Sequence, residues 1–355
     1  MTDRMPRTVT AAQPTRAPVR RPDRRLAPAA TLAVAVGVLA VVATTSLAIG
    51  TRQVPIDVVL SAFAAPVAGD ADQVVVRDLR LPRAVIGVMA GAAFGVVAAL
   101  LQGATRNPLA DPGLLGLNAG ASLAVVAAIA FLGVTSPFGF IWFAFGGAAL
   151  AAVVVFAIGS TGGAGATPAK LALTGAALTA ATTPLITLLL IRDVGTLAQY
   201  RFWSVGSLSG RGFETAVVVW PFLAVGLVVA AWLAGRLNLL ALGDDVARGL
   251  GVRLGTTRIA TAVAVILLAG TATSLAGPIA LLGLAVAHAA RGLVGGDYRW
   301  TVPLAGVLGA IVLLAADVLG RIVVAPAELE AGIVAAIVGA PVLIALVRRT
   351  KGSTL

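Results

Sequence analysis

Few side chains in the apolar stretches of this sequence could take part in chemistry. Asp317 and Arg321 lie four residues apart in one apolar run, so a helix would bring them together on one face as an ion pair. Pairing offsets the roughly 2.5–3.5 kcal/mol that an unpaired aspartate costs in a membrane-spanning helix. His288 is the only histidine, and we expect a hydrogen-bond donor near a helix end rather than a metal ligand or a proton carrier. These residues predict a structural ion pair and no metal site.

The motifs of common catalytic and energy-converting sites are missing. The chain has no cysteine, which excludes disulfides and thiolate metal sites. It has no G-x-x-x-x-G-K-[ST] sequence, because the glycines at 162–165 stand at the wrong distance from Lys170 and no hydroxyl residue follows. No nucleophile–base arrangement and no acidic pair within an apolar run is present. We therefore predict no enzyme activity and no bound cofactor. An ion-coupled secondary transporter, which needs such charges, is the rival from a different class.

The composition predicts an all-α polytopic membrane protein. The 355 residues are 59% hydrophobic and 12% charged, whereas soluble domains carry about 25% charged residues. About ten apolar runs are long enough to cross a bilayer as helices of about 20 residues. We expect these spans at residues 27–50, 84–105, 114–134, 139–159, 171–191, 215–235, 258–276, 278–293, 301–320 and 331–347.

The positive charge predicts how the spans are oriented. With ten spans, most of the 26 lysines and arginines fall on the side of the N-terminus, and cytoplasmic loops carry the excess of such residues. Both termini are therefore expected in the cytoplasm, and the net charge of +11 needs no nucleic-acid partner. Residues 27–350 would form one ten-helix transmembrane domain. Residues 1–26 are rich in arginine and proline and predict a disordered basic cytoplasmic tail, with a secretion signal as the alternative.

Residues 102–121, QGATRNPLADPGLLGLNAGA, form an irregular stretch between two apolar runs. Pro108 and Pro112 cannot continue a helix, and the glycines allow tight turns. Irregular backbone beside a bilayer is tolerated only where protein buries it or where it lines a watery cavity. This stretch predicts a shaped loop at one mouth of a pathway, and an ordinary helix–helix turn is the alternative.

Two segments on the outer side carry possible interface residues. Arg80 and Arg83 bracket a Leu-Pro pair just before a span and would hold positive charge at the outer mouth, although interfacial snorkelling also explains such arginines. Trp203, beside Tyr200 and Phe202, fits an aromatic belt at the membrane surface.

Residues 236–257 form the longest inner connection and predict a short amphipathic helix. Asp244 or Asp245 can cap its N-terminus, and Gly251 can end it. Its apolar face would consist of Leu239, Leu242, Val246 and Leu250. Such a helix can dock into another protein, and the alternative is a helix that rests on lipid headgroups.

Several of these motifs occur in a familiar order. They are RLPR at 80–83, the 102–121 stretch, RFWSVGSLSG at 201–210, LALGDDVARGLGV at 240–252, GPIALLGLAVAHAAR at 277–291, the Asp317 and Arg321 pair, the Glu328 loop and GAPVLIALVRR at 339–349. The series resembles the iron-siderophore/cobalamin permease family of ABC importers over about residues 30–350. Within the family, it looks most like a permease subunit for ferric enterobactin.

The resemblance implies a type II ABC importer permease fold in the cytoplasmic (inner) membrane, in contact with membrane lipid. It implies a second permease subunit, either a paralogue or another copy, and two separate ABC ATPases that bind ATP and Mg. A siderophore-binding protein outside the membrane would deliver the cargo. The implied cargo is a ferric siderophore of catecholate type, with cobalamin or haem as the alternative within the family.

The resemblance also implies roles for individual residues. Binding-protein docking would fall to Arg80, Arg83 and Arg321. The gate of the substrate pathway would consist of Asn107, Leu109, Thr174 and Gly175. Coupling to the ATPase would involve Gly243, Asp244, Asp245, Ala247, Leu250 and Gly251.

Overall fold

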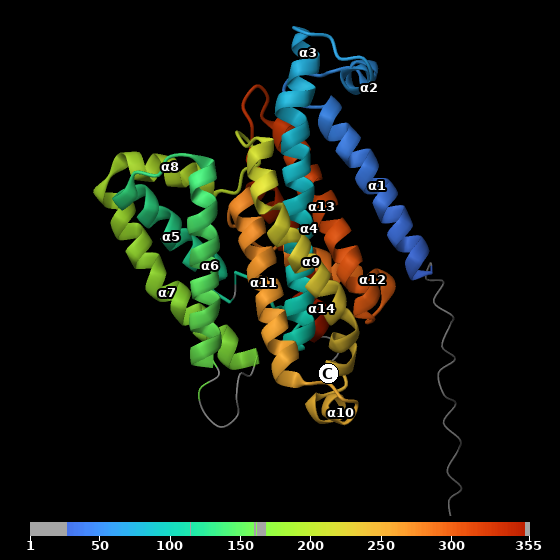
Figure 1. The fold of residues 1–355 in the computed structure, drawn as a ribbon, viewed down its shortest axis with the longest axis vertical. Helices are drawn as coiled ribbons and strands as arrows, with labels where there is room; N and C mark the ends of the chain where they lie inside the picture. The colour runs from blue at the N-terminus through green and yellow to red at the C-terminus, as the bar shows by residue number, and fades with distance from the viewer. Residues whose placement is uncertain (1–26, 114, 160, 162–167, 352–355) are drawn as a thin grey trace, which may run out of the picture.

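A computed structural model describes residues 27–113, 115–159, 161 and 168–351, and every regular element in these ranges is a helix (Figure 1). Seven helices are long and apolar enough to cross a membrane, and three shorter apolar helices accompany them. These are α1 (Pro28–Ala48), α4 (Leu81–Thr105), α5 (Leu117–Leu132), α6 (Pro137–Gly159), α7 (Pro168–Arg192), α9 (Phe213–Leu240), α11 (Leu254–Ala276), α12 (Leu282–Val294), α13 (Tyr298–Val323) and α14 (Ala331–Lys351). The predicted all-α polytopic fold is confirmed, and the predicted tail, residues 1–26, lies outside the described residues.

Five short helical elements complete the described chain: α2 (Ile56–Ala64), α3 (Ala71–Val74), the π-helical turn η1 (Val75–Arg80), α8 (Val194–Ser204) and α10 (Asp244–Gly249). The elements α3, η1 and α4 follow one another without a break. Helices α2 and α3 lie at one end of the bundle and α10 at the other (Figure 1). We refer to these as the α2 end and the α10 end.

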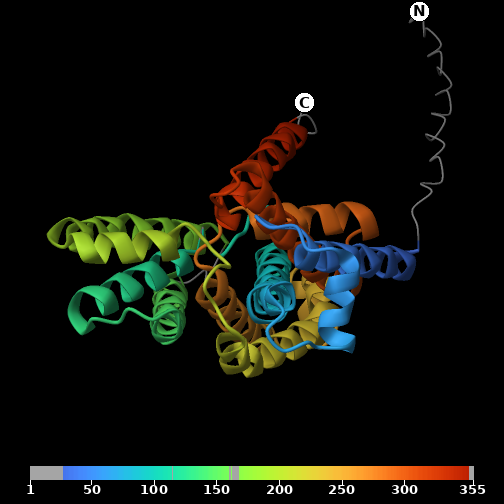
Figure 2. The same ribbon diagram turned by 90° about the horizontal axis from the view of Figure 1, so that it is seen from above.

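Helix α4 runs through the middle of the main bundle, with α1, α9, α11, α12 and α13 around it (Figure 2). Small residues let its neighbours approach closely. A methyl group on Gly95 would overlap the backbone carbonyl of Ala305 in α13, and one on Gly283 of α12 would lie 2.7 Å from the Phe94 carbonyl oxygen. Close approach of this kind is how helices associate in membranes. The glycines therefore allow α12 and α13 to pack closely against α4, which lies at the centre of the bundle.

Helices α5 to α8 form a second group beside the main bundle (Figures 1 and 2). A methyl group on Gly120 of α5 would lie 2.5 Å from the Gly147 carbonyl oxygen of α6, so these two helices also cross at glycines. Trp203 is only 3% exposed and belongs to the core of this group, with its ring centroid 6.0 Å from that of Tyr200. The prediction of an aromatic belt position is therefore wrong for Trp203, because its ring fills this core.

Seen from above, α7 and α14 lie on one side of the molecule, and α9 and α11 lie on the other (Figure 2). Both α7 and α14 expose large apolar side chains. These include Leu185, Leu188, Ile191, Ile337 and Ile344. The two sides of the protein are therefore available to different neighbours in the membrane.

Candidate functional site

At the α2 end, one buried carboxylate holds two arginines. Asp317 of α13 is 1% exposed. Its Oδ1 accepts a hydrogen bond from Arg83 Nη2 at 2.7 Å, and its Oδ2 lies 2.8 Å from Nη2 of Arg321, one turn further along α13. Arg83 Nη1 donates to Glu328 Oε2 at 2.8 Å and to Ser209 Oγ at 3.1 Å. These five residues, here named the charge cluster, join α4, α13 and two loops.

Arg321 and Arg80 also close the C-terminal end of α1. Arg321 Nη1 donates to the Ser46 carbonyl at 3.0 Å and to the Ile49 carbonyl at 3.1 Å. Arg80 Nη1 donates to the two carbonyls between them, at 2.7 and 2.8 Å. The last carbonyls of a helix lack partners within the helix. Both arginines are nearly inaccessible, at 2% and 6% exposure, because they bind these carbonyls.

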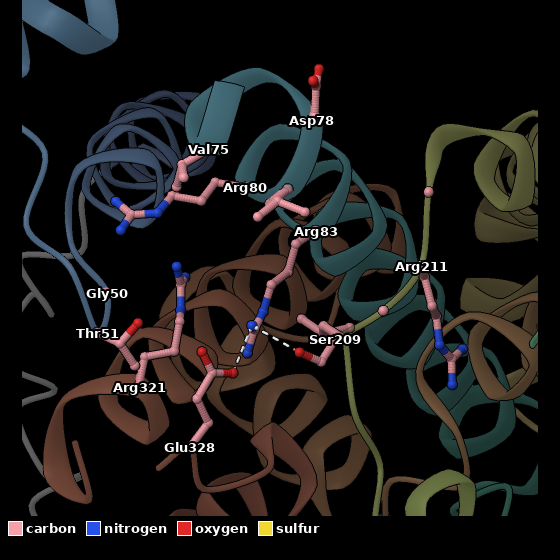
Figure 3. Close-up of a pocket in the computed structure, with 14 residues that line it drawn as sticks. Gly50, Thr51, Val75, Asp78, Arg80, Arg83, Ser209, Arg211, Arg321 and Glu328 are labelled. Carbon is pink, nitrogen blue, oxygen red and sulfur yellow. Dashed lines mark hydrogen bonds and ion pairs between the residues drawn. The ribbon is translucent and has the colours of Figure 1, made fainter. Parts of the chain in front are cut away.

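A cavity of about 460 Å³ opens beside the charge cluster. In Figure 3, Arg83 points towards Glu328 and Ser209, Arg80 and Arg321 have their guanidinium groups on the side of Gly50, and Arg211 lies apart from them. The structure thus brings the three predicted docking arginines together. Glu328 keeps 31% of its side chain exposed and Arg83 keeps 12%. An anionic group that enters the cavity would therefore meet Arg83 in competition with Glu328.

Arg211 is a partly buried arginine to which the sequence assigned no role. Its guanidinium donates to the Ser274 carbonyl at 2.6 Å and to the Leu275 carbonyl, so it closes the end of α11. Burial lowers the pKa of Arg211 to about 10, and the charge of Glu330 opposes that shift. The side chain therefore stays charged at neutral pH. An arginine within the glycine-rich GSLSGRG stretch at 206–212 was the available signal.

At the α10 end, the described residues 106–113, 115 and 116 between α4 and α5 form a run of turns. Asn107 Oδ1 accepts the Leu109 N–H at 2.9 Å, and Asp111 Oδ1 accepts the Gly113 N–H at 2.8 Å. These are the side-chain turns that Asn and Asp favour. Asp111 is 7% exposed, and burial raises the pKa of its carboxyl to about 6. The irregular stretch is shorter than the predicted range 102–121, because α4 continues to Thr105 and α5 begins at Leu117. Its place at the mouth of a pathway stays a prediction.

The start of α7 touches this loop. Gly116 ends the loop with a φ of 73°, a conformation that glycine adopts without strain. A methyl group on Gly116 would lie 3.0 Å from the Gly175 carbonyl oxygen. Thr174 Oγ1 donates within its own helix, to the Lys170 carbonyl at 2.8 Å. The two segments that hold the predicted gate residues are thus neighbours through Gly116 and Gly175.

The N-terminus of α10 differs from the prediction. Gly243 precedes the helix and no side chain caps it, so the predicted cap by Asp244 or Asp245 is wrong. The reason is that Asp244 forms ion pairs with two other segments. Its Oδ1 pairs with Arg106, the first residue of the 106–116 loop, and its Oδ2 pairs with Arg258 of α11 at 2.7 Å. Helix α10 is thereby connected directly to the loop that follows the C-terminus of α4.

The C-terminus of α10 agrees with the prediction. Gly251 has a φ of 85°, its N–H donates to the Arg248 carbonyl at 2.9 Å, and the Val252 N–H donates to the Ala247 carbonyl at 2.9 Å. This pair of bonds is the Schellman motif that glycine permits. Ala247 is fully buried, whereas Leu250 is 57% exposed. Leu242 and Val246 are 60% and 50% exposed, so α10 and the residues that flank it present apolar side chains to their surroundings.

Comparison with known proteins identifies the family. Residues 38–349 match the FecCD transport family. This chain belongs to the FecCD transport family. It is similar to the ferric enterobactin transport system permease protein FepD of Escherichia coli, with 44% identity over 309 residues that cover 86% of this chain and 92% of FepD. It is also similar to the probable siderophore transport system permease protein YfiZ of Bacillus subtilis, with 41% identity over 281 residues that cover 79% and 84% of the two chains.

The fold of this FecCD-family chain also has a solved counterpart. It is similar to a metal-chelate type ABC transporter solved in an inward-facing conformation, with a TM-score of 0.79 and 26% identity. The match covers 90% of this chain and 99% of the other. The FecCD-family chain is therefore a multi-pass membrane permease of the transport type, with the fold that its sequence motifs implied.

Proposed function

We propose that this chain is the permease subunit of an ABC importer that carries ferric siderophores inward across the cytoplasmic membrane. One observation carries the choice of cargo: the similarity to FepD and YfiZ, which extends over most of each chain. The absence of a P-loop sequence supports separate ATPase subunits as the site of ATP and Mg binding. In this proposal, both termini and α10 lie in the cytoplasm, and the charge cluster faces outward.

The proposed transport needs movement rather than covalent chemistry. Binding of the ATPase would act on the exposed apolar face of α10, and the Arg106–Asp244 ion pair would pass the movement to the 106–116 loop. The contact between Gly116 and Gly175 supports a gate built from this loop and the start of α7. A second permease subunit, either a paralogue or another copy, would pack against the apolar side formed by α7 and α14.

The opposite end would receive the siderophore-binding protein. The cavity beside the charge cluster presents Arg83 and holds Arg80 and Arg321 close behind it. Acidic groups of the binding protein would complement this positive region and set the orientation of docking. Because Glu328 already pairs with Arg83, docking would replace one carboxylate with another.

The test is uptake by whole cells under iron limitation. A deletion strain and its complemented parent would be given labelled ferric catecholate siderophore, ferric hydroxamate siderophore, haem and cobalamin. We expect loss of ferric siderophore uptake alone, restored by complementation. Loss of haem or cobalamin uptake alone would refute the cargo while retaining the transport mechanism. An unchanged uptake of all four would refute the importer itself, provided that the chain is present in the membranes of the parent.

A further inference from the structure

A second cavity, of about 550 Å³, opens at the α10 end, away from the charge cluster and the gate segments. It adjoins the apolar face proposed to bind the ATPase and shares Leu250 with that face. It lies between α9, the segment 250–257 and the start of α13. Three arginines from these three places line it: Arg236, Arg253 and Arg299. None of the described residues that line the cavity carries a carboxylate. The cavity therefore gathers positive charge without an acidic partner of its own.

Two of the three guanidinium groups are held against the same turn of α9. Arg236 stacks on Trp232, with its Cζ 3.4 Å from the indole centroid, and its Nη1 donates to the Trp232 carbonyl at 3.2 Å. Arg299 Nη2 lies 3.6 Å from the position that a methyl group on Gly235 would take. Stacking on an aromatic ring fixes a cation in place without neutralising its charge. These arginines are thus arranged in advance for an anion.

An acidic residue at the start of α13, Asp297, forms hydrogen bonds outside the cavity. Asp297 Oδ1 accepts hydrogen bonds from Asn238 Nδ2 at 2.6 Å and from the backbone N–H of Arg299 at 2.9 Å. These bonds lower the pKa of the Asp297 carboxyl and keep it at the start of α13. The charge of Arg299 contributes to the same pKa shift, but Asp297 does not line the cavity, whereas Arg299 does.

The exposed face of α9 next to the cavity is apolar, which indicates that the anion has an apolar part. Val225, Val228 and Trp232 follow one another at helical spacing and are 53%, 69% and 46% exposed. Arg236 is the next residue in this series. An exposed apolar stripe that ends in an aromatic ring and arginines is the pattern of a helix that leaves the hydrocarbon layer. A lipid would place its acyl chains along the stripe and its phosphate among the arginines.

We infer that this cavity binds the headgroup of an anionic phospholipid in the leaflet at the α10 end. The proposed topology makes this the cytoplasmic leaflet, where basic pockets between transmembrane helices bind anionic headgroups. The side of the molecule fits as well, because α9 lies opposite α7 and α14 (Figure 2). A second permease subunit on the α7 and α14 side would leave the cavity open to lipid.

The test is a lipid titration of the purified full-length chain in detergent, followed by native mass spectrometry. We expect one phosphatidylglycerol to bind saturably and phosphatidylcholine to bind much more weakly. Each of the variants Arg236→Gln, Arg253→Gln and Arg299→Gln should weaken phosphatidylglycerol binding about fivefold. Arg248→Gln is the matched control, since Arg248 lies in the same connection and pairs with Asp245 outside the cavity, and it should leave binding unchanged.

Four results would overturn the inference. Equal binding of phosphatidylcholine, or an equal loss in Arg248→Gln, would show that the arginines do not select the lipid. Displacement of phosphatidylglycerol by millimolar inorganic phosphate would assign the cavity to a free anion. Displacement by the purified ATPase subunit would assign this surface to a protein interface. None of these results depends on the transported cargo, so the inference and the proposed function can fail separately.

Discussion

At the scale of single residues, the arginines at the α2 end have structural partners that limit how docking can be tested. Arg80 and Arg321 bind the last carbonyls of α1, and Arg83 binds Asp317 and Glu328. Reversing the charge of Arg83 would place a third carboxylate beside two others. Breaking a buried ion pair costs about 3–5 kcal/mol. A loss of activity in such a variant would therefore reflect lower stability rather than weaker docking. An exposed neighbour gives a cleaner test.

Ser209 is that neighbour, since it is exposed and accepts a hydrogen bond from Arg83. Ser209→Asp should add a carboxylate that competes with the binding protein for Arg83. We expect the stimulation of ATP hydrolysis by the binding protein to fall at least about threefold in the reconstituted importer. Ser209→Asn is the uncharged control of the same size and should retain the stimulation. Equal stimulation in both variants would contradict docking at this cavity.

Asp111 predicts a pH dependence of stability. Burial raises the pKa of its carboxyl to about 6, above its value in the unfolded chain, so the fold favours the protonated form. Stability should therefore fall as the pH rises from about 4 to about 6, and the full penalty applies above that range. Asp111→Asn keeps the oxygen that accepts the Gly113 N–H and removes the charge.

We expect Asp111→Asn to raise the free energy of unfolding at pH 7.5 by about 1–3 kcal/mol. The difference from the wild-type protein should shrink as the pH falls towards 4. Thermal unfolding of both purified proteins across this pH range measures it. Parallel pH profiles would show that the carboxyl does not titrate as its burial implies.

At the scale of elements, the carboxylate of Asp244 connects α10 to the gate loop. Asp244 pairs with Arg106 and with Arg258, whereas the ion pair of its neighbour Asp245 among the described residues is with Arg248 of α10 itself. Asp244→Asn should leave ATP hydrolysis in the assembled importer active but lower transport per ATP at least about threefold, because the loop no longer follows α10. Transport and hydrolysis would be measured in the same vesicles. The control Asp245→Asn should keep their ratio, and the same ratio in both variants would contradict the proposed connection.

The two ends of α10 show what a sequence can predict about an element. Gly251 ends the helix as expected, because a left-handed residue after a short helix depends on local backbone geometry alone. Asp244 does not cap the other end, because its partners lie 138 and 14 residues away. A local preference for capping yields to ion pairs that only the tertiary fold creates.

The candidate site likewise contains local contacts that could be predicted and long-range contacts that could not. The pairing of Asp317 with Arg321 follows from a spacing of four residues, and it could be predicted. The pairing of Asp317 with Arg83 spans 234 residues, and no pattern in the sequence indicates it. Glu328 and Arg211 were likewise given no structural role in advance, because their partners belong to distant segments. The apolar runs, by contrast, could be used to predict the membrane helices, because the length and composition of one continuous segment decide whether it can cross a bilayer.

At the scale of the whole molecule, the close approach of α4 and α13 predicts opposite effects for two similar substitutions. Gly95→Ala should push α4 away from the Ala305 carbonyl and cost about 1–3 kcal/mol. Gly37→Ala on α1 meets nothing within 4 Å and should stabilise its helix by up to about 1 kcal/mol. Thermal unfolding of the two purified variants measures both effects. Equal melting temperatures would show that the central helix pair is not tightly packed.

The contact between α1 and Arg321 has a consequence for biosynthesis. The arginine that closes α1 follows Ser46 by 275 residues. At a synthesis rate of about 5–20 residues per second, it emerges about 14–55 s later. Arg80 follows the two carbonyls between Ser46 and Ile49 by at most 33 residues and can bind them early. The Ser46 and Ile49 carbonyls, by contrast, stay hydrated until α13 is inserted. The end of α1 is thus closed in two stages, and a ribosome that stalls before Arg321 leaves α1 with the Arg80 contact and without the α13 contact.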